Sequence, residues 1–461
     1  MELVYDKGTL LLINVPGDYR PPSFFKFDER VNAYRTLAKN YWLALRKIPN
    51  LTDRVLELPE CVWPSISIGL RPYQEEALEA WLRAGGRGVI VLPTGSGKTH
   101  VALAAVSEVR APTLIVTPTL DLVEQWIRMA RQVLKIEASE FTGDSKEIGC
   151  ITVSTYSSAY LNAELLGNRF KLLVFDEAHH LPGESYRQIA EMSVAPMRMG
   201  LTATPERQDE LHALLPSLVG DVVYRVSPEE LKGKYLAEFE IRRVYVDIPG
   251  EERKRYEELV EKYSKSLARL GFKVRSRIDF EKLTFLSSRY SEARDALLAL
   301  LEARKIAFNA EAKLKKLYEI LEKHRGEKII IFTDTNDLAR RISLTLLVPE
   351  ITFKTGREER RKILEMFKVG EVKVLVTSHV LDEGVDVPDA TVAVVISGSG
   401  SPREFLQRLG RLLRPKKDKQ AILYELVTRG TREVNVSIRR HSSVARKSKA
   451  TKRKNASVKN R

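Results

Sequence analysis

The sequence predicts an α/β protein of two doubly wound parallel-sheet lobes, with a small N-terminal α+β module and a helical insertion between the lobes. Short β-branched runs alternate with amphipathic segments from residue 88 to 226, and the alternation returns from residue 328 to 428. Alternating strands and helices of this kind form parallel sheets covered by helices. The chain of 461 residues is long enough for several such domains.

The first lobe is expected over residues 66–235 and the second over residues 310–435. In the first, the predicted buried strands are "GVIVLP", "TLIVTP", "CITVSTY", "KLLVFDE" and "MRMGLTAT". In the second they are "KIIIFTDT", "ITFKTGR", "VKVLVTS", "VAVVIS" and "AILYELV". Open sheets of this class bind ligands outside the carboxyl ends of their strands, so a binding site is expected at those ends.

Residues 236–309 are predicted to form a linker and a helical insertion. Within "EERKRYEELVEKYSKSLARLGF" apolar residues recur at steps of three and four, and Gly271 is positioned to end the helix. The many Lys and Arg residues of the insertion could grip nucleic acid or form the solvated face of a helical hairpin. The apolar stripe consists of Tyr256, Leu259, Val260, Tyr263, Leu267 and Leu270.

The two ends of the chain differ from the lobes. Residues 1–65 predict a small separate α+β module, whose aromatic residues could stack on bases or form its core. These aromatic residues are Phe24, Phe25, Phe27, Tyr34, Tyr41 and Trp42. Residues 436–461 contain ten Lys and Arg residues and no acid, and predict a disordered tail. The tail could be a solvated end or could bind phosphate backbones.

The net charge and the cysteines indicate which kind of partner and which cellular compartment to expect. The net charge of +15 favours a polyanionic partner, although basicity alone could also serve a membrane surface or simple solubility. The chain has neither an apolar run of membrane-spanning length nor the basic start of a signal peptide, so we expect a cytoplasmic protein that does not contact membranes. Cys61 and Cys150 are far apart and lack metal-ligand spacing, so unpaired structural thiols are expected.

The stretch "LPTGSGKTH" lies between a predicted strand and a predicted helix. It fits the phosphate-binding loop pattern at its end but has leucine where the pattern begins with glycine. Its glycines keep the turn free of Cβ atoms, so backbone N–H groups can converge on phosphate oxygens at the helix N-terminus. Lys98 is expected to reach the β- and γ-phosphates, and the Thr99 hydroxyl to bind Mg²⁺. The predicted nucleotide-binding residues are Leu92, Pro93, Thr94, Gly95, Ser96, Gly97, Lys98 and Thr99.

Two further stretches predict the rest of a hydrolysis site. In "KLLVFDEAHH" a buried strand ends at two carboxylates: Asp176 can hold Mg²⁺, and Glu177 can orient and deprotonate a water for attack on a phosphate. In "EFLQRLGRLLRP", Arg411 and Arg414 are three apart on a predicted helix and can act as arginine fingers that neutralise transition-state charge.

Polar residues near the acidic pair suggest coupling between nucleotide state and the rest of the lobe. His179 and its neighbour have no third partner at ligand spacing, so no zinc site is expected. In "LTATPERQDE", Thr202 and Thr204 could hydrogen-bond His179 and transmit the nucleotide state, or could cap the following helix.

Taken together, these motifs resemble those of superfamily 2 helicases, and more narrowly the XPB family in its compact archaeal form, over about residues 66–435. "LPTGSGKT", "DEAHH", "LTATPER" and "QRLGRLLR" resemble motifs I, II, III and VI, and the leucine at position 92 is what this family usually carries. The resemblance implies two tandem RecA-like lobes, a helical thumb at the insertion and a damage-recognition-like N-terminal domain.

The resemblance also implies roles for single residues. "LRPYQEEAL" resembles the Q-type motif, in which Gln74 would read adenine; a surface glutamine is the alternative. "LIVTPTLDLVEQW", "VSTYSSAY" and "TSHVLDEGVDVP" imply that Thr117, Thr155 and Thr377 contact the nucleic-acid backbone. The last of these stretches also implies that Asp386 reaches the ribose.

The family carries a charged Arg-Glu-Asp triplet that contacts DNA and is linked to duplex opening. Here the triplet reads Arg207, Gln208 and Asp209, and the loss of one carboxylate concerns strand separation rather than translocation. The resemblance implies a DNA-stimulated ATPase and helicase that uses ATP and Mg²⁺ and moves 3′ to 5′. Its substrate would be fork, bubble or tailed duplex DNA in nucleotide excision repair or transcription.

The same resemblance implies a monomer, or a heterodimer with a partner nuclease. Three alternative functions stay open from the sequence: a duplex translocase that does not separate strands, an RNA helicase, and a DNA clamp without turnover.

Overall fold

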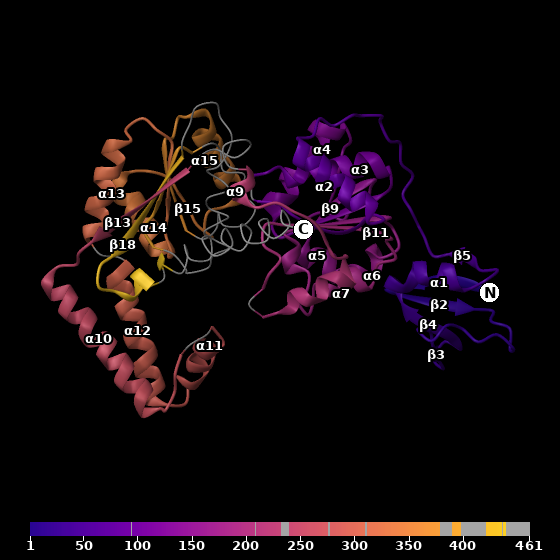
Figure 1. Cartoon of the computed structure of the whole chain (residues 1–461), viewed down its shortest axis with the longest axis horizontal. Helices are drawn as coiled ribbons and strands as arrows, with labels where there is room; N and C mark the ends of the chain where they lie inside the picture. The colour runs from indigo at the N-terminus through magenta and orange to yellow at the C-terminus, as the bar shows by residue number, and fades with distance from the viewer. Residues whose placement is uncertain are drawn as a thin grey trace, which may run out of the picture. The chain divides into compact units, whose positions relative to one another are not determined.

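The computed structural model describes residues 1–93, 95–207, 209–231, 239–274, 277–308, 311–378, 390–397, 421–435 and 437–438. The chain forms two compact units, one comprising residues 1–236 and the other beginning at residue 237. Each unit contains a parallel sheet, and the first unit also carries an N-terminal sheet (Figure 1). The predicted α/β class is confirmed. Within the described residues, no helix combines the length and apolar character needed to cross a membrane.

The sheet of the first lobe is parallel at every described pairing. Its strands, in spatial order, are β12 (Val222–Arg225), β6 (Arg87–Val91), β11 (Met197–Thr202), β10 (Leu172–Asp176), β7 (Thr113–Thr117), β9 (Ile151–Thr155) and β8 (Ser139–Phe141). Every residue of β7, β9 and β10 is buried, as expected of strands covered on both faces. The short edge strand β8 was not predicted.

Helices cover both faces of this sheet, with α2, α3 and α4 on one side and α5, α6 and α7 on the other (Figure 1). The helices are α2 (Pro72–Arg83), α3 (Lys98–Val109), α4 (Leu120–Leu134), α5 (Tyr156–Leu161), α6 (Ala163–Leu166), α7 (Arg187–Glu191), α8 (Leu215–Leu218) and α9 (Pro228–Leu231). α4 begins where the Thr119 hydroxyl accepts a hydrogen bond from the Leu122 N–H. It buries one stripe of side chains that includes Trp126.

The sheet of the second lobe is also parallel at its described pairings. Its strands, in spatial order, are β13 (Phe239–Val246), β18 (Ala421–Thr428), β17 (Val392–Val395), β14 (Ile329–Phe332), β16 (Val374–Thr377) and β15 (Glu350–Ile351). Its helices include α13 (Glu311–Lys323), α14 (Asn336–Leu346) and α15 (Arg357–Val369).

β13 corrects the predicted domain plan. The sequence assigned residues 236–309 to a linker and a helical insertion, but β13 pairs along its whole length with β18 in the second-lobe sheet. The adjacent Arg242 and Arg243 interrupt its apolar alternation, which is why it did not stand out as a strand.

The helical insertion consists of α10 (Gly250–Arg269), α11 (Arg277–Leu286) and α12 (Ser291–Phe308). α10 and α12 lie side by side (Figure 1). The predicted apolar stripe of α10 is confirmed, because Tyr256, Leu259, Tyr263 and Leu267 are buried and Val260 and Leu270 pack against them. The facing stripe of α12 is alanine-rich, and small side chains allow two helices to approach closely. It comprises Ala293, Ala296, Ala299, Ala303 and Ala307.

The N-terminal module is a mixed sheet with one short helix, as the sequence predicted. In spatial order its strands are β3 (Lys26–Asp28), β4 (Ala33–Leu37), β2 (Thr9–Ile13), β1 (Glu2–Asp6) and β5 (Thr52–Arg54), and its helix is α1 (Tyr41–Lys47). The core role is confirmed for part of the aromatic set, and stacking on bases stays a prediction for the residues that are exposed. Phe25 and Tyr41 are in the core, whereas Phe27 and Trp42 are 51% and 41% exposed.

The module packs against the first lobe through specific contacts. The Tyr5 hydroxyl lies 3.1 Å from the Met192 carbonyl oxygen and 3.0 Å from that of Glu164. Asn168 Nδ2 donates to the Val55 carbonyl at 3.0 Å. The lobe also places Val194 in the apolar core of the module. Module and lobe therefore share one interface.

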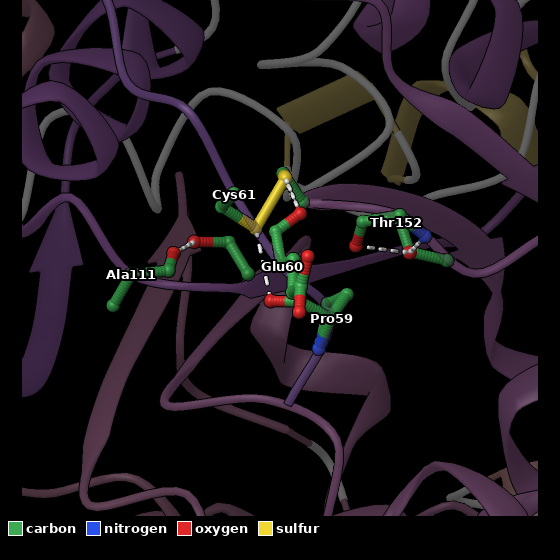
Figure 2. Close-up of a disulfide and its surroundings, with 8 residues drawn as sticks. Pro59, Glu60, Cys61, Ala111 and Thr152 are labelled. Carbon is green, nitrogen blue, oxygen red and sulfur yellow. Dashed lines mark hydrogen bonds between the residues drawn. A yellow bond between two sulfur atoms is a disulfide. The ribbon is translucent and has the colours of Figure 1, made fainter. Parts of the chain in front are cut away.

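A disulfide between Cys61 and Cys150 ties the segment that follows the module to the start of β9 (Figure 2). The two Cα atoms are 5.6 Å apart, within the range that a disulfide spans. The predicted unpaired thiols are therefore wrong. That prediction relied on the sequence separation of 89 positions, but the chain between the cysteines returns through the first-lobe sheet and brings them together.

Candidate active site

The carboxyl edge of the first-lobe sheet gathers the predicted motifs. β6, β11 and β10 are neighbours, with Val91 paired to Thr202 and Leu201 paired to Asp176. The loops that follow these three strands therefore start side by side. Because the strands are parallel, this is the edge at which α/β sheets bind their ligands.

The loop between β6 and α3 has the backbone that phosphate binding needs. Gly95 and Gly97 have φ angles of 80° and 82°, in the left-handed region that favours glycine. A Cβ atom on Gly97 would lie 2.4 Å from Nε2 of Gln74. Leu92 extends the strand rather than starting the turn, because its N–H donates to the Thr202 carbonyl at 3.0 Å. This explains why leucine is tolerated where the pattern has glycine.

Lys98 begins α3 and is 9% exposed. Among the described residues its ammonium makes one hydrogen bond, a long one of 3.5 Å to the Leu92 carbonyl. Thr99 follows in the first helical turn and is partly exposed. A buried ammonium with so weak a partner fits a site that receives an anion.

Gln74 is a buried residue that braces the loop. Its Nε2 donates to the Ser96 carbonyl at 2.8 Å, and its Oε1 accepts from the Arg71 N–H at 2.9 Å. The Tyr73 hydroxyl donates to the same Ser96 carbonyl at 2.6 Å. The alternative of a surface glutamine is therefore wrong, because Gln74 is only 5% exposed. Recognition of adenine by Gln74 stays a prediction.

Asp176 is the last residue of β10 and is 7% exposed. Its Oδ2 accepts from the Trp126 indole N–H at 2.9 Å, and its Oδ1 accepts from the Glu177 N–H at 3.1 Å. Burial, helped by the negative charge of Glu177, raises the pKa of Asp176 to about 6, while Lys98 and the indole oppose the rise. The carboxylate is thus held in a place that favours a nearby cation.

Glu177 has a strained backbone, with a φ angle of 48°. Its Oε2 is buried and has no hydrogen-bond partner among the described residues, although His179 Nδ1 lies 3.4 Å away. This left-handed conformation is uncommon for a residue other than glycine. A carboxylate with a spare buried oxygen fits the predicted role of holding a water molecule.

His179 lies in the turn after β10 and is 1% exposed. Its Nδ1 lies 3.1 Å from the Thr202 hydroxyl, so the structure brings together two of the three predicted coupling residues. Thr204 joins them through its main chain, since its N–H donates to the Thr202 hydroxyl at 3.2 Å. Whether these contacts transmit the nucleotide state stays a prediction.

Two members of the predicted DNA-contacting triplet are paired with each other. Arg207 Nε donates to Asp209 Oδ1 at 2.8 Å, and this contact lowers the pKa of Asp209 to about 2. Arg207 Nη1 also donates to the His179 carbonyl at 2.6 Å. Arg207 therefore links Asp209 to the turn that carries the acidic pair.

The predicted backbone contacts of Thr117 and Thr377 are not supported. Each is the last residue of a buried strand and has no exposed surface. The Thr377 hydroxyl donates to the carbonyl of the next residue at 2.8 Å, and that of Thr117 to a carbonyl two residues on at 3.5 Å. Thr155 is 8% exposed, and its hydroxyl accepts from an N–H in the first turn of α5 at 3.1 Å. Its structural role is helix capping.

The sequence missed two side chains that hold Asp176. Trp126 binds its carboxylate, and the Tyr156 hydroxyl donates to its main-chain oxygen at 3.0 Å. Both residues sit in apolar stripes of their helices, so nothing in the local pattern distinguished them from ordinary core residues. A contact over 50 positions, as between Trp126 and Asp176, depends on the order of the strands.

Five predicted site residues lie outside the described part of the chain. They are Thr94, Gln208, Asp386, Arg411 and Arg414. The arginine fingers and the ribose contact therefore stay predictions.

The residues at this edge fit ATP with Mg²⁺. The described residues contain no cluster of three or more His, Cys, Asp and Glu side chains that could ligate a metal ion. Mg²⁺ needs no such cage, because it is usually held by one or two carboxylates, waters and substrate phosphates. Asp176 and Thr99 would supply the protein ligands.

Comparison with known sequence families divides the chain into three parts. Residues 3–46 match the Xeroderma pigmentosum group B helicase damage recognition domain. Residues 67–207 match the res subunit of type III restriction enzymes, and residues 288–452 match the ERCC3/RAD25/XPB C-terminal helicase family.

Two known proteins indicate the same family, and one solved structure has a similar fold. The chain is 47% identical over 445 residues to the DNA 3'-5' translocase XPB2 of Sulfurisphaera tokodaii, covering 95% of this chain and 99% of that protein. It is 30% identical to the DNA 3'-5' helicase XPB of Kineococcus radiotolerans, covering 90% and 70%. The crystal structure of the Pyrococcus furiosus Hef helicase domain has a similar fold, with a TM-score of 0.52, 22% identity, and coverage of 79% and 97%. This chain therefore belongs to the XPB family of superfamily 2 helicases.

Proposed function

We propose that this chain is an ATP-dependent DNA helicase or translocase that moves 3′ to 5′. The observation that carries the proposal is the Asp176–Glu177 pair at the end of β10, on the same sheet edge as the Lys98 loop. Phosphoryl transfer needs these parts together: a cation for the phosphates, a carboxylate for Mg²⁺ and a group that positions water. The names of the two relatives, a DNA 3'-5' translocase and a DNA 3'-5' helicase, support DNA as substrate and the direction.

The chemistry divides among a few side chains. When bound, Mg²⁺ supplies positive charge that neutralises the phosphates. Lys98 binds the same phosphates, while the buried acceptor of Glu177 orients the attacking water and takes its proton. Gln74 and Asp386 are proposed to bind the adenosine part. Arg411 and Arg414 are proposed to add charge from the second lobe.

The proposed biological role is to open or pump DNA in nucleotide excision repair or transcription. The net charge of +15 favours binding to the phosphate backbone, which positions a motor without reading sequence. Fork, bubble and tailed duplexes are the proposed substrates, and a nuclease is a proposed partner.

A second candidate, translocation without strand separation, is favoured by one residue. Gln208 stands where the family triplet has a glutamate, so one of the two carboxylates linked to duplex opening is missing. Strand displacement from tailed duplexes and displacement of a triplex-forming strand separate the two activities. Triplex displacement without strand displacement on any tailed or forked duplex would favour the second candidate.

The proposed site is tested by ATP turnover on DNA and on RNA, with Lys98→Ala as the variant. Lys265→Ala, which removes an exposed lysine of α10, is the matched control. We expect strong stimulation by DNA and a loss of about 10²–10³-fold in Lys98→Ala, the size typical of removing one preorganised charge-stabilising group. Unchanged turnover in Lys98→Ala would place hydrolysis elsewhere, and stronger stimulation by RNA would favour an RNA helicase.

A further inference from the structure

Trp126 is a buried tryptophan whose polar atom is directed at the candidate active site. It lies in the apolar stripe of α4 and is 1% exposed. Its indole Nε1–H donates to Oδ2 of Asp176 at 2.9 Å. A buried indole N–H needs an acceptor, but packing alone does not require that acceptor to be a carboxylate.

The partner is unusual when Trp126 is compared with Trp81. Trp81, in α2, is also fully buried, and its indole donates to the main-chain carbonyl of Arg198 at 3.0 Å. Arg198 lies near the start of β11, away from the carboxyl edge. A buried indole needs an acceptor, and a backbone carbonyl is sufficient. Trp126 instead uses the carboxylate that ends the central strand β10.

The contact fixes the carboxylate without using up its acceptor capacity. The indole holds Oδ2, the Glu177 N–H holds Oδ1 at 3.1 Å, and the Tyr156 hydroxyl holds the main-chain oxygen at 3.0 Å. An ionised carboxylate has roughly four acceptor positions, so both oxygens retain room for another partner. An indole N–H donates only and does not titrate, so it orients the carboxylate at every working pH.

We propose that Trp126 is a positioning residue for divalent-cation binding by Asp176, acting through its indole N–H. This inference rests on the proposed function, in which Asp176 holds Mg²⁺. Partners that orient a metal-binding carboxylate typically change metal affinity by about 10- to 100-fold when they are removed. The indole therefore contributes to the Mg²⁺ dependence of nucleotide binding, beyond its contribution to packing.

The first test compares Trp126→Phe with Trp81→Phe in the full chain. Both variants lose an indole N–H and keep an aromatic ring in the first-lobe core, so losses of packing are matched. The readout is Mg²⁺-dependent binding of a fluorescent, non-hydrolysable ATP analogue. We expect the Mg²⁺ concentration for half-maximal binding to rise about 10-fold in Trp126→Phe and to stay unchanged in Trp81→Phe. Equal Mg²⁺ dependence in the two variants would overturn the proposal.

Asp176→Asn separates failure of this inference from failure of the proposed site. If Asp176→Asn keeps the wild-type Mg²⁺ dependence, Asp176 does not bind the cation and both ideas fail. If Asp176→Asn loses it while Trp126→Phe keeps it, only the role of Trp126 fails.

A second measurement needs no tryptophan variant to fold. The chain has four tryptophans, so labelling with ¹⁵N-tryptophan gives four indole N–H signals. We expect one of them to shift in Asp176→Asn, and the same signal to shift in the wild-type protein on adding Mg²⁺ with the analogue. If no indole signal responds to Asp176→Asn, the proposed contact is absent and the proposal is overturned.

Discussion

Two buried lysines, Lys98 in the first lobe and Lys313 in the second, differ in how fully their hydrogen bonds are satisfied. In the second lobe, Lys313 Nζ donates to both Glu433 oxygens at 2.7 and 2.8 Å and to the Ile396 carbonyl at 2.8 Å. Glu433 also accepts from a main-chain N–H at 2.9 Å. In the first lobe, Lys98 has one long hydrogen bond among the described residues, and burial raises the pKa of Asp176.

The difference separates a structural charge pair from a functional one. Buried ions are tolerated when their hydrogen bonds are complete, and the Lys313–Glu433 pair meets that condition without any ligand. The charges at the carboxyl edge of the first lobe are incompletely satisfied, which is costly for folding and useful for binding. Incomplete satisfaction, rather than burial itself, is therefore the signal of a site.

The largest expected effect on the free energy of unfolding comes from breaking the Lys313–Glu433 pair. Lys313→Ala leaves Glu433 buried without its cation, so the free energy of unfolding of the second lobe should fall by about 3–5 kcal/mol. Urea denaturation of the full chain, followed by limited proteolysis, measures the change. The double variant Lys313→Met/Glu433→Leu should recover most of the loss. A loss below about 1 kcal/mol in the single variant would remove the contrast between the lobes.

For Asp176→Asn we expect a smaller change in the opposite direction, an increase in the free energy of unfolding. The pKa of Asp176 is raised from 3.8 to about 6 in the folded chain, so its protonated form is the stabilising one. The contribution of protonated Asp176 to the stability of the fold is fully present below about pH 4 and is lost as the pH rises through about 6. Asparagine imitates the protonated form, so Asp176→Asn should stabilise the ligand-free first lobe by about 1–3 kcal/mol at pH 7.5.

The measurement for Asp176→Asn is the free energy of unfolding between pH 4 and pH 8 without nucleotide. The advantage of the variant over the wild type should shrink as the pH falls and vanish near pH 4. If the difference in free energy of unfolding between variant and wild type stayed constant across this range, ionisation of Asp176 would not destabilise the fold.

The smallest effect is expected for an exposed pair. Lys265 and Glu261 on α10 approach to 2.7 Å, but both side chains are about two-thirds exposed. Lys265→Ala should change the free energy of unfolding by less than about 0.5 kcal/mol, because water screens the pair. Thermal melting at low and high salt measures it. A change in the free energy of unfolding above about 1 kcal/mol would show that solvent exposure does not determine how much each charged side chain contributes to stability.

The sequence predicted what depends on local pattern. The strands that form the sheets, the glycines around Lys98 and the two acids at the end of β10 are local features, because burial and turn chemistry act over a few residues. The strand β13 was not predicted because Arg242 and Arg243 interrupt the alternation of apolar and polar residues. Both arginines lie on an edge strand, where charge is tolerated.

What the sequence could not predict depends on strand order. The Trp126–Asp176 contact and the Cys61–Cys150 bond join residues far apart in the chain, and no local pattern encodes them. For Thr117 and Thr377 a motif match located the residues at strand ends, and only the packed sheet shows that their hydroxyls are covered; their contacts with nucleic acid stay predictions.

The disulfide also sets how far the N-terminal module can travel if its interface opens. With Cys61 fixed to Cys150, the free chain beyond β5 is short enough that the module stays within roughly 25 Å of the first lobe. Without the bond the free segment runs to the start of α2, and the reach grows to roughly 60 Å. The redox state of the two sulfur atoms would therefore set the distance over which the module can move from the first lobe.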